Sequence, residues 1–287
     1  MKKVMILSVF VMLTMSLSAQ NFKLDGKYSL NNSSNIDYLT ISGDKISYKL
    51  WNKKDELTAK YKIVHDEGLT FIKMSEKFPE EFTDEYDSGK KIKTSDKILI
   101  LAGKKIDSDS VILFGTTSGF YNYKTLIEPR HFEVVTQSKD CSSYLIEKNK
   151  KYPVSNLSDY NVETPWVEGA SGYGIGESFT IENSWGAPRP YLLIMNGYIS
   201  YEKPYLYKQN GRIKKIKVKG LSSGKEKVLD VLDTPHPQTV DISFIQDLED
   251  IRITIEDVYP GTKYEDTCIH YMIGYYDEVV PYEDSIK

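Results

Sequence analysis

The feature that most restricts the fold of this chain is a two-residue alternation of apolar and polar side chains in short runs. The run Asp250–Glu256 places three isoleucines on one face, and Ile216 and Val218 alternate with lysines in the same way. A period of two is typical of a strand, whereas a helix repeats its apolar positions every three or four residues. Gly, Pro and Asn turns separate these runs, and no segment has a convincing amphipathic helical pattern. The sequence therefore predicts an all-β protein.

The N-terminal half predicts a small antiparallel sheet or barrel. The stretch Tyr38–Leu50 alternates on both sides of a turn at Gly43, which indicates a hairpin. A second hairpin is expected at Tyr61–Met74, again around a glycine-containing turn. The charged stretch Ser75–Ser95 is expected to be a loop, with a short helix as the alternative. We expect residues 22–130 to form this domain, whose role the sequence does not define.

The C-terminal half predicts a β-sandwich. A length of 287 residues suits two domains, and the boundary is expected near residues 130–138, after a connector with little periodicity. The second domain is expected at 138–280. Within it, Tyr191–Met195 is a continuous apolar run, which is typical of a strand buried on both faces.

The extreme N-terminus has the pattern of a secretory signal peptide. Lys2 and Lys3 precede the apolar run Val4–Leu17, and small residues follow it. The run is shorter than a membrane-spanning helix requires. We expect residues 1–20 to be removed, so that the mature protein is exported to the periplasm, the cell surface or the medium without a transmembrane segment.

Export makes the two cysteines, Cys141 and Cys268, candidates for one disulfide, since the compartment is oxidising. A loop of this length would stabilise the fold by roughly 4–5 kcal/mol in the chain-entropy model. The alternative is that Cys268 is a buried free thiol, because it lies in the strand-like run Thr267–Ile273.

Composition and motifs argue against several functional classes. A net charge of −4 without a concentrated basic face does not suit nucleic acid, whose binding depends on phosphate neutralisation. The 4 histidines are scattered and no Cys or His cluster suits zinc, so we expect no metal and no cofactor. The glycine run Gly172–Gly176 precedes a strand-like stretch instead of the helix that a nucleotide loop needs. No pair of carboxylates stands out as a general acid and base.

Four stretches resemble a known family when taken together in order and spacing. They are Asn156–Glu177, Ile194–Tyr198, Asn210–Arg212 and Asp257–Thr267. Together they resemble the NADase-type glycan-binding domain, a discoidin-like module, over about residues 141–276. The resemblance implies a jelly-roll sandwich of the galactose-binding type and carbohydrate binding as the family activity. No NAD-hydrolysing domain is evident in the N-terminal half.

The residues in these stretches have the chemistry that sugar recognition requires. Tyr and Trp rings cover the apolar faces of sugars, while carboxylates, amides and the Arg fork bond to their hydroxyls. The predicted glycan-binding residues are Trp166, Glu168, Tyr173, Asn196, Tyr198, Tyr205, Asn210, Arg212, Tyr259 and Asp266.

Calcium was weighed for the first loop of the module, because sandwiches of this class often carry one. Asp159, Asn161 and Thr164 offer oxygen ligands at a suitable spacing. Tyr271, however, stands where the family tends to place a carboxylate. No metal ligand is therefore predicted.

The sequence thus predicts an exported, non-catalytic protein that recognises a glycan or glycoconjugate. Two alternatives stay open. One is a protein–protein interaction module of the cell envelope, without sugar binding. The other is a small enzyme in the N-terminal domain that the binding module targets.

Overall fold

The protein is almost entirely β-structure in the computed structural model, as its alternating sequence predicts. Helical turns among the described residues are confined to η1 (Val154–Leu157) and α1 (Leu206–Gln209). The predicted signal peptide, the acidic stretch after Pro79 and the connector before Ser138 lie outside the part that the structure describes. That part comprises residues 24–29, 36–50, 56–79, 94–107, 111–116, 138–158, 164–182, 189–245 and 249–282.

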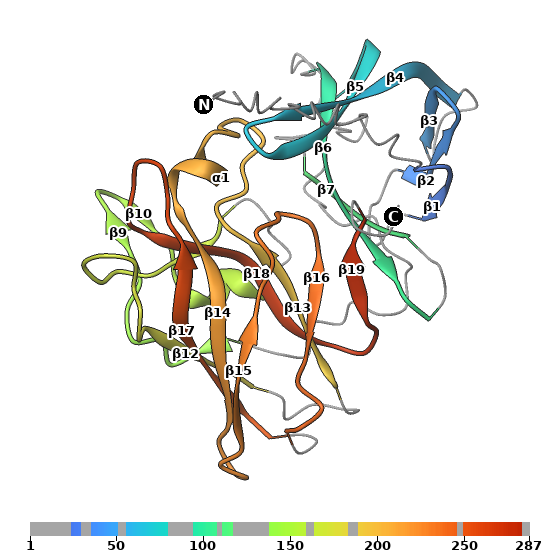
Figure 1. Ribbon diagram of the computed structural model, residues 1–287. Helices are drawn as coiled ribbons and strands as arrows, with labels where there is room; N and C mark the ends of the chain where they lie inside the picture. The colour runs from blue at the N-terminus through green and yellow to red at the C-terminus, as the bar shows by residue number, and fades with distance from the viewer. Residues whose placement is uncertain are drawn as a thin grey trace, which may run out of the picture.

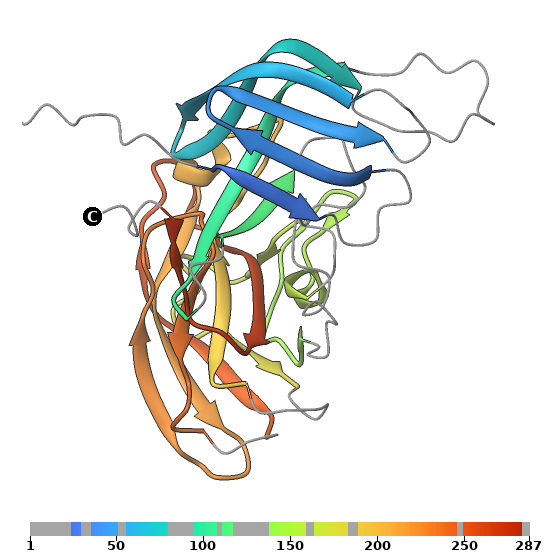
Figure 2. The ribbon, with the colours of Figure 1, turned by 90° about the vertical axis from the view of Figure 1, so that its right-hand side faces the viewer.

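The N-terminal half forms a curved antiparallel sheet (Figures 1 and 2). Its strands follow chain order up to β6, which pairs both with β7 and with β19, a strand from the C-terminal end of the chain. The strands are β1 (Gly26–Ser29), β2 (Ile36–Ser42), β3 (Lys45–Leu50), β4 (Glu56–Asp66), β5 (Leu69–Pro79), β6 (Thr94–Lys105), β7 (Val111–Thr116) and β19 (Val279–Pro281).

Both predicted hairpins of this sheet are confirmed. β2 and β3 meet at a turn in which Gly43 has φ 59°, and β4 and β5 meet at a turn in which Glu67 and Gly68 have φ 52° and 88°. Two consecutive residues with positive φ match the twist of a tight hairpin. The alternation on either side of each glycine was therefore sufficient to locate the turns.

The C-terminal half is one nine-stranded sheet folded into a sandwich. β14 and β18 run parallel and pair only through Gly211–Arg212 and Thr267–Cys268, so the sheet divides into two branches there. The strand order is β16-β13-β18-β14-β17-β12-β8, with β11 on β18 and β15 on β14; β9 and β10 form a separate hairpin. These strands are β8 (Ser138–Lys139), β9 (Ile146–Glu147), β10 (Lys150–Lys151), β11 (Trp166–Val167), β12 (Ser178–Ile181), β13 (Tyr191–Asn196), β14 (Gly211–Gly220), β15 (Glu226–Asp230), β16 (Gln238–Asp241), β17 (Ile251–Tyr259) and β18 (Thr267–Tyr275).

The two branches enclose one apolar core, to which every long strand contributes alternate residues. β17 turns its three isoleucines inward, as the alternation predicts, and β14 turns Ile216 and Val218 inward. From the opposite branch, Leu192 and Ile194 of β13 and Met272 of β18 complete the core.

A second apolar core joins the two halves of the chain. Leu69, Phe71, Leu99 and Leu101 of β5 and β6 pack against residues on the outer faces of β13 and β18. The run Tyr191–Met195 is therefore buried on both faces, as predicted. Members of this shared core from the C-terminal half include Leu193, Met195, Ile199, Tyr207, Tyr271, Ile273 and Tyr275.

His236 connects the halves through hydrogen bonds. β5 pairs with β6 as far as Ile100 and β19 pairs with it from Gly103, which leaves a gap in the ladder. In this gap the backbone N–H of Ala102 donates to Nδ1 of the buried His236 at 3.0 Å. Nε2 therefore carries the proton of the neutral ring, and it lies 3.4 Å from the hydroxyl of Thr70. A loop of the sandwich thus completes the hydrogen bonding of the N-terminal sheet.

The predicted disulfide is absent, and both cysteines are free thiols. Cys268 points to the outer face of β18, where it packs with Tyr152 and Val167. Cys141 packs against the core between the two branches. The two thiols therefore belong to different apolar clusters, which is the physical reason that the prediction was wrong.

The contact between the two halves can be tested at Gly68. A Cβ atom there would lie 3.0 Å from Cδ1 of Tyr207 and 3.2 Å from Cε of Lys208, whereas a Cβ at Gly43 would meet nothing within 4 Å. Gly43→Ala should lower the free energy of unfolding by about 1–2 kcal/mol, because alanine is strained at the positive φ of this position. Gly68→Ala should cost about 1–3 kcal/mol more because it also overpacks the interface. Urea denaturation measures both, and equal losses would show that this turn does not press on α1.

Candidate functional site

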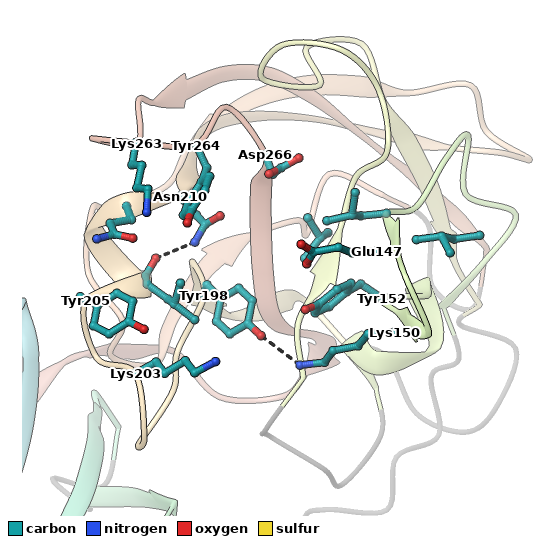
Figure 3. Close-up of a pocket in the computed structure, with 15 residues that line it drawn as sticks. Glu147, Lys150, Tyr152, Tyr198, Lys203, Tyr205, Asn210, Lys263, Tyr264 and Asp266 are labelled. Carbon is teal, nitrogen blue, oxygen red and sulfur yellow. Dashed lines mark hydrogen bonds between the residues drawn. The ribbon is translucent and has the colours of Figure 1, made fainter.

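An open cavity of about 790 Å³ lies at one end of the sandwich (Figure 3). One wall is the β9–β10 hairpin with the adjoining Tyr152. The facing wall is α1 with the chain that leads into it, and the loop between β17 and β18 closes the rim. Three segments far apart in sequence therefore meet around one space, as in many ligand sites.

Gly197 explains how Tyr198 enters this cavity. Gly197 has φ 90°, and its N–H donates to the carbonyl of Cys268 at 3.1 Å. A Cβ atom at this position would lie 2.8 Å from the ring of Tyr207 and 2.9 Å from Cγ of Arg212. Glycine thus lets the chain turn sharply out of β13 and places Tyr198 in the cavity.

The β17–β18 loop is fastened to the end of α1. The N–H groups of Lys263 and Tyr264 both donate to the carbonyl of Gln209, at 3.2 and 2.8 Å, and that of Thr262 donates to Lys208 at 3.0 Å. Gly261 permits this approach, because a Cβ there would lie 2.4 Å from the same Gln209 carbonyl. The carbonyls that the helix end leaves unpaired hold the loop, which presents Lys263 and Tyr264 to the cavity.

Four tyrosines line the cavity at two levels. Tyr152 and Tyr198 lie edge to face with ring centroids 6.1 Å apart, and Lys150 donates to the Tyr198 hydroxyl at 3.3 Å. Burial and the hydrogen bond with Tyr152 raise the pKa of Tyr198, so its hydroxyl stays protonated. Tyr205 and Tyr264 stand nearer the solvent, 41% and 36% exposed. The cavity thus offers both polar hydroxyls and accessible ring surface.

Two further polar groups in the cavity have unused bonding capacity. Burial raises the pKa of Asp266, with Glu147 and Glu265 adding to the shift, and no other described residue donates to its carboxylate. Asn210 donates its amide nitrogen to the Leu206 carbonyl at 2.8 Å, and among the described residues nothing donates to its side-chain oxygen. Figure 3 shows Asp266 between the two walls. Both oxygens can accept hydrogen bonds from a ligand.

The structure brings four of the ten predicted site residues together in this cavity: Tyr198, Tyr205, Asn210 and Asp266. The remaining six do not line it. They are Trp166, Glu168, Tyr173, Asn196, Arg212 and Tyr259. Five of these six have their side-chain polar groups bonded within the fold, and Tyr173 packs against the core.

Trp166 and Glu168 stabilise the start of the sandwich. Trp166 is fully buried against Phe179, with ring centroids 5.0 Å apart, and its indole N–H donates to the Ser143 carbonyl. Glu168 is also fully buried and accepts the N–H groups of Ala170 and Thr267 at 2.7 and 3.1 Å. Desolvation raises the pKa of this carboxyl. Neither side chain lines the cavity.

Asn196 and Arg212 fasten the junction between β13 and β14. The buried Asn196 donates to the carbonyl of Ile213 at 2.6 Å and accepts the N–H of the same residue at 2.9 Å. Arg212 forms two bonds with Asp233, at 2.7 and 3.1 Å. Its guanidinium is thereby occupied by the fold.

Tyr173 and Tyr259 have structural positions as well. Tyr173 packs against the main core, and its carbonyl accepts the Thr267 hydroxyl at 2.8 Å. Tyr259 donates its hydroxyl to the carbonyl of Val231 at 3.1 Å. For these six residues, the chemistry that suggested sugar binding serves internal packing and hydrogen bonding.

Several cavity residues were missed from the sequence. Lys263 and Tyr264 lie inside one of the four motif stretches, so their exposure on a turn was a usable signal. Glu147, Lys150 and Tyr152 belong to a hairpin whose strands have two residues each, too short for any alternation to show.

The described residues show no constellation for metal binding or thiol catalysis. No three His, Cys, Asp or Glu side chains among them gather as a metal site. Burial raises the pKa of both cysteine thiols, which opposes the reactive thiolate form. Asp159 and Asn161, weighed for calcium, lie outside the described ranges. No described helix is long and apolar enough to cross a bilayer.

The family model of the NAD glycohydrolase translocation F5/8 type C domain matches residues 131–273. The C-terminal half of this chain belongs to this discoidin-like family. The cavity lies within the F5/8 type C domain, whereas most of the N-terminal sheet lies outside the matched residues. No curated protein matches the chain.

Solved structures similar to the chain include two from Clostridium perfringens. One is the family 32 carbohydrate-binding module of NanJ in complex with galactose (17% identity, TM-score 0.35, covering 50% of this chain and 93% of the module). The other is a family 32 module in complex with GlcNAc-α-1,4-galactose (15%, 0.34, 54% and 97%). The C-terminal domain of a chitobiase from Bacteroides fragilis is similar at 12% identity and a TM-score of 0.35, covering 50% of this chain and 95% of that domain.

The structural role of Asn196 in the F5/8 type C domain can be tested with two substitutions. Asn196→Ala removes partners of the Ile213 backbone and should destabilise the protein by about 1–3 kcal/mol. Asn196→Asp also places a buried carboxylate beside the Ile213 and Leu232 carbonyls and should cost about 3–5 kcal/mol. Denaturant titration measures both. A variant as stable as the parent would contradict the structural assignment.

Proposed function

We propose that this chain is an exported, non-catalytic glycan-binding protein that holds a sugar in the cavity of its F5/8 type C domain. The observation that carries the proposal is one open space in which accessible tyrosine rings stand beside polar groups that the fold leaves uncommitted. The presence of tyrosine rings and polar groups in one space matters because a sugar presents both an apolar face and a ring of hydroxyls. A purely apolar or purely charged cavity would suit other ligands.

Each part of the cavity has a role in this proposal. The rings of Tyr205 and Tyr264 cover the C–H faces of a sugar. The Asp266 carboxylate and the Asn210 oxygen accept hydrogen bonds from its hydroxyls. The cavity volume lies in the range of roughly 300–1,000 Å³ that is typical of small-ligand sites. Its openness toward solvent leaves room for a longer glycan to extend beyond the rim.

Export and the absence of catalysis belong to the same proposal. The proposal of export rests on the signal-peptide pattern of residues 1–20. A purely binding role rests on the cavity chemistry, since neither a thiolate nor a metal cluster is found among the described residues.

Protein recognition is the second candidate function. Ile146 is 56% exposed and Tyr144 is 37% exposed on the segment that forms one cavity wall, and apolar side chains there suit a protein partner. The two functions differ in one observable. A protein partner would stay bound in the presence of competing sugar, whereas glycan retention would be lost.

The site assignment is tested by tyrosine variants of the full mature chain on a glycan array. Tyr205→Ala and Tyr264→Ala should each weaken glycan binding about five- to twentyfold, through loss of ring contact worth about 1–2 kcal/mol. Tyr276→Ala is the control, because that ring is 37% exposed, close to the 41% and 36% of the two cavity rings, and follows the far end of β18, where its hydroxyl accepts from Arg189 at 3.4 Å. If all three variants bind as tightly as the parent, the cavity is not the glycan site.

The raised pKa of Asp266 predicts a pH dependence of binding. The ionised carboxylate accepts hydroxyl hydrogen bonds more strongly than the protonated group. Glycan affinity should therefore increase as pH rises through the Asp266 pKa, which lies above the usual 3.8, and should fall on acidification. Asp266→Asn should bind more weakly at neutral pH and lose this step. Isothermal titration between pH 4 and 8 measures both proteins, and an identical profile for the variant would exclude the role of Asp266.

A further inference from the structure

The lysines of this domain fall into two groups by their partners. Along β14, on the outer face of the sandwich, several are ion-paired: Lys214 with Asp257 and Lys217 with Glu256 at 2.7 Å, and Lys215 with Asp230 at 3.2 Å. The three lysines that line the cavity, Lys150, Lys203 and Lys263, have no carboxylate within ion-pair distance among the described residues. Exposed lysines outside the cavity, such as Lys225 and Lys227, also have no ion pair among the described residues, so it is the position of the cavity lysines that distinguishes them.

Two of these lysines face each other. Figure 3 shows Lys150 and Lys203 extending toward one another from opposite walls, on either side of the Tyr198 hydroxyl. Two ammonium groups that converge without an anion between them repel, and the repulsion is strongest where the walls reduce solvent screening. An anion placed between them would remove this repulsion and gain a contact with each lysine. Lys263 lies apart from this pair, where its ammonium is 4.8 Å from the ring centre of Tyr264.

The cavity carboxylates do not fill this position. Glu147 and Asp266 lie in the same cavity but neither pairs with a lysine within 4.0 Å. The pKa of Asp266 is raised by burial, whereas a close ammonium group would lower it. Glu147 lies opposite Lys150 in the β9–β10 register without pairing with it among the described residues, and Figure 3 shows Asp266 away from the Lys150–Lys203 pair.

The geometry points to a ligand that is a sugar with an anionic substituent, held between Lys150 and Lys203. This inference rests on the proposed function, because it takes the cavity to be the glycan site. General attraction of anions does not account for the arrangement, since the net charge of the whole chain is −4. A carboxylate, as in a uronic acid, and a sulfate ester share the chemistry that two ammonium groups recognise.

Three sugars that differ at one carbon atom separate these possibilities. Galactose, galacturonic acid and galactose 6-sulfate carry a neutral, a carboxylate and a sulfate group at position six. Titration of the full mature chain, followed by NMR shifts of the protein, should give at least about tenfold tighter binding of one or both acidic sugars than of galactose. The preference should shrink as NaCl is raised, because screening weakens partly exposed charge pairs.

Lysine variants test the position of the charge. Lys203→Gln should reduce affinity for the preferred acidic sugar about tenfold and should reduce affinity for galactose much less. Lys150→Gln should do the same, with an added effect from the lost bond to Tyr198. Lys217→Gln is the control, because that lysine is paired with Glu256 on the outer sheet. Thermal unfolding of each variant verifies that the fold is retained.

The outcomes separate the two proposals. If galactose binds in the cavity as tightly as both acidic sugars, the charge inference is overturned and glycan binding stands. If folded lysine variants keep the full preference for acidic sugars, the assignment of the ligand's anionic group to Lys150 and Lys203 is wrong. If neither these sugars nor any array glycan binds, the proposed function fails and the inference fails with it.

Discussion

The burial of β13 and β18 between two apolar cores is the constraint on which the remainder of the structure depends. Leu192 and Ile194 point into the sandwich, while Leu193 and Met195 point toward the N-terminal sheet. A sandwich with one face exposed to water would carry polar residues there. Because this outer face is apolar, the C-terminal half needs a cover, and β5 and β6 supply it. The pairing of β19 with β6 and the bond from Ala102 to His236 add backbone contacts to the same interface. The N-terminal domain is thus part of the packing of the binding domain, whatever else it does.

The short helix α1 connects this shared core to the cavity. Tyr207 belongs to the core shared by the two halves and lies against the turn at Gly68, whereas Tyr205 and Gln209 of the same segment line the cavity. A helix of four residues has little stability of its own. Its position is fixed from outside, by the N-terminal turn on one side and by the β17–β18 loop on the other. Distortion at Gly68 should therefore reach the cavity wall through the side chains of Tyr207 and Lys208.

Local pattern predicted the strands well and the site only in part. Alternation located both N-terminal hairpins and the inward isoleucines of β17, because a period of two is a property of the strand itself. The motif stretches also led to Tyr198, Tyr205, Asn210 and Asp266. They led equally to Trp166, Glu168 and Asn196, because a ring, a carboxylate or an amide has the same chemistry whether it meets a sugar or a backbone group. Only tertiary packing decides which of these is buried. Lys150 and Tyr152 were beyond prediction, since their cavity wall is a hairpin with two-residue strands that comes near α1 only in the folded chain.

If the cavity holds a glycan as proposed, the distribution of charge gives it a basis for discriminating among ligands. Lysines along β14 lie opposite carboxylates on neighbouring strands, so their positive charges are neutralised on the outer sheet. Exposed ion pairs of this kind contribute little to stability. Inside the cavity, the lysines have no carboxylate partner among the described residues, although Lys150 donates to the Tyr198 hydroxyl, and the walls are fastened by backbone hydrogen bonds. Groups fixed in this way lose little freedom when a ligand arrives, so more of the interaction energy appears as affinity. A ligand whose charges oppose those of the walls benefits from this rigidity. A neutral sugar of the same shape leaves the repulsion between the lysines in place. The difference in binding free energy between the acidic and the neutral sugar is the basis of selectivity.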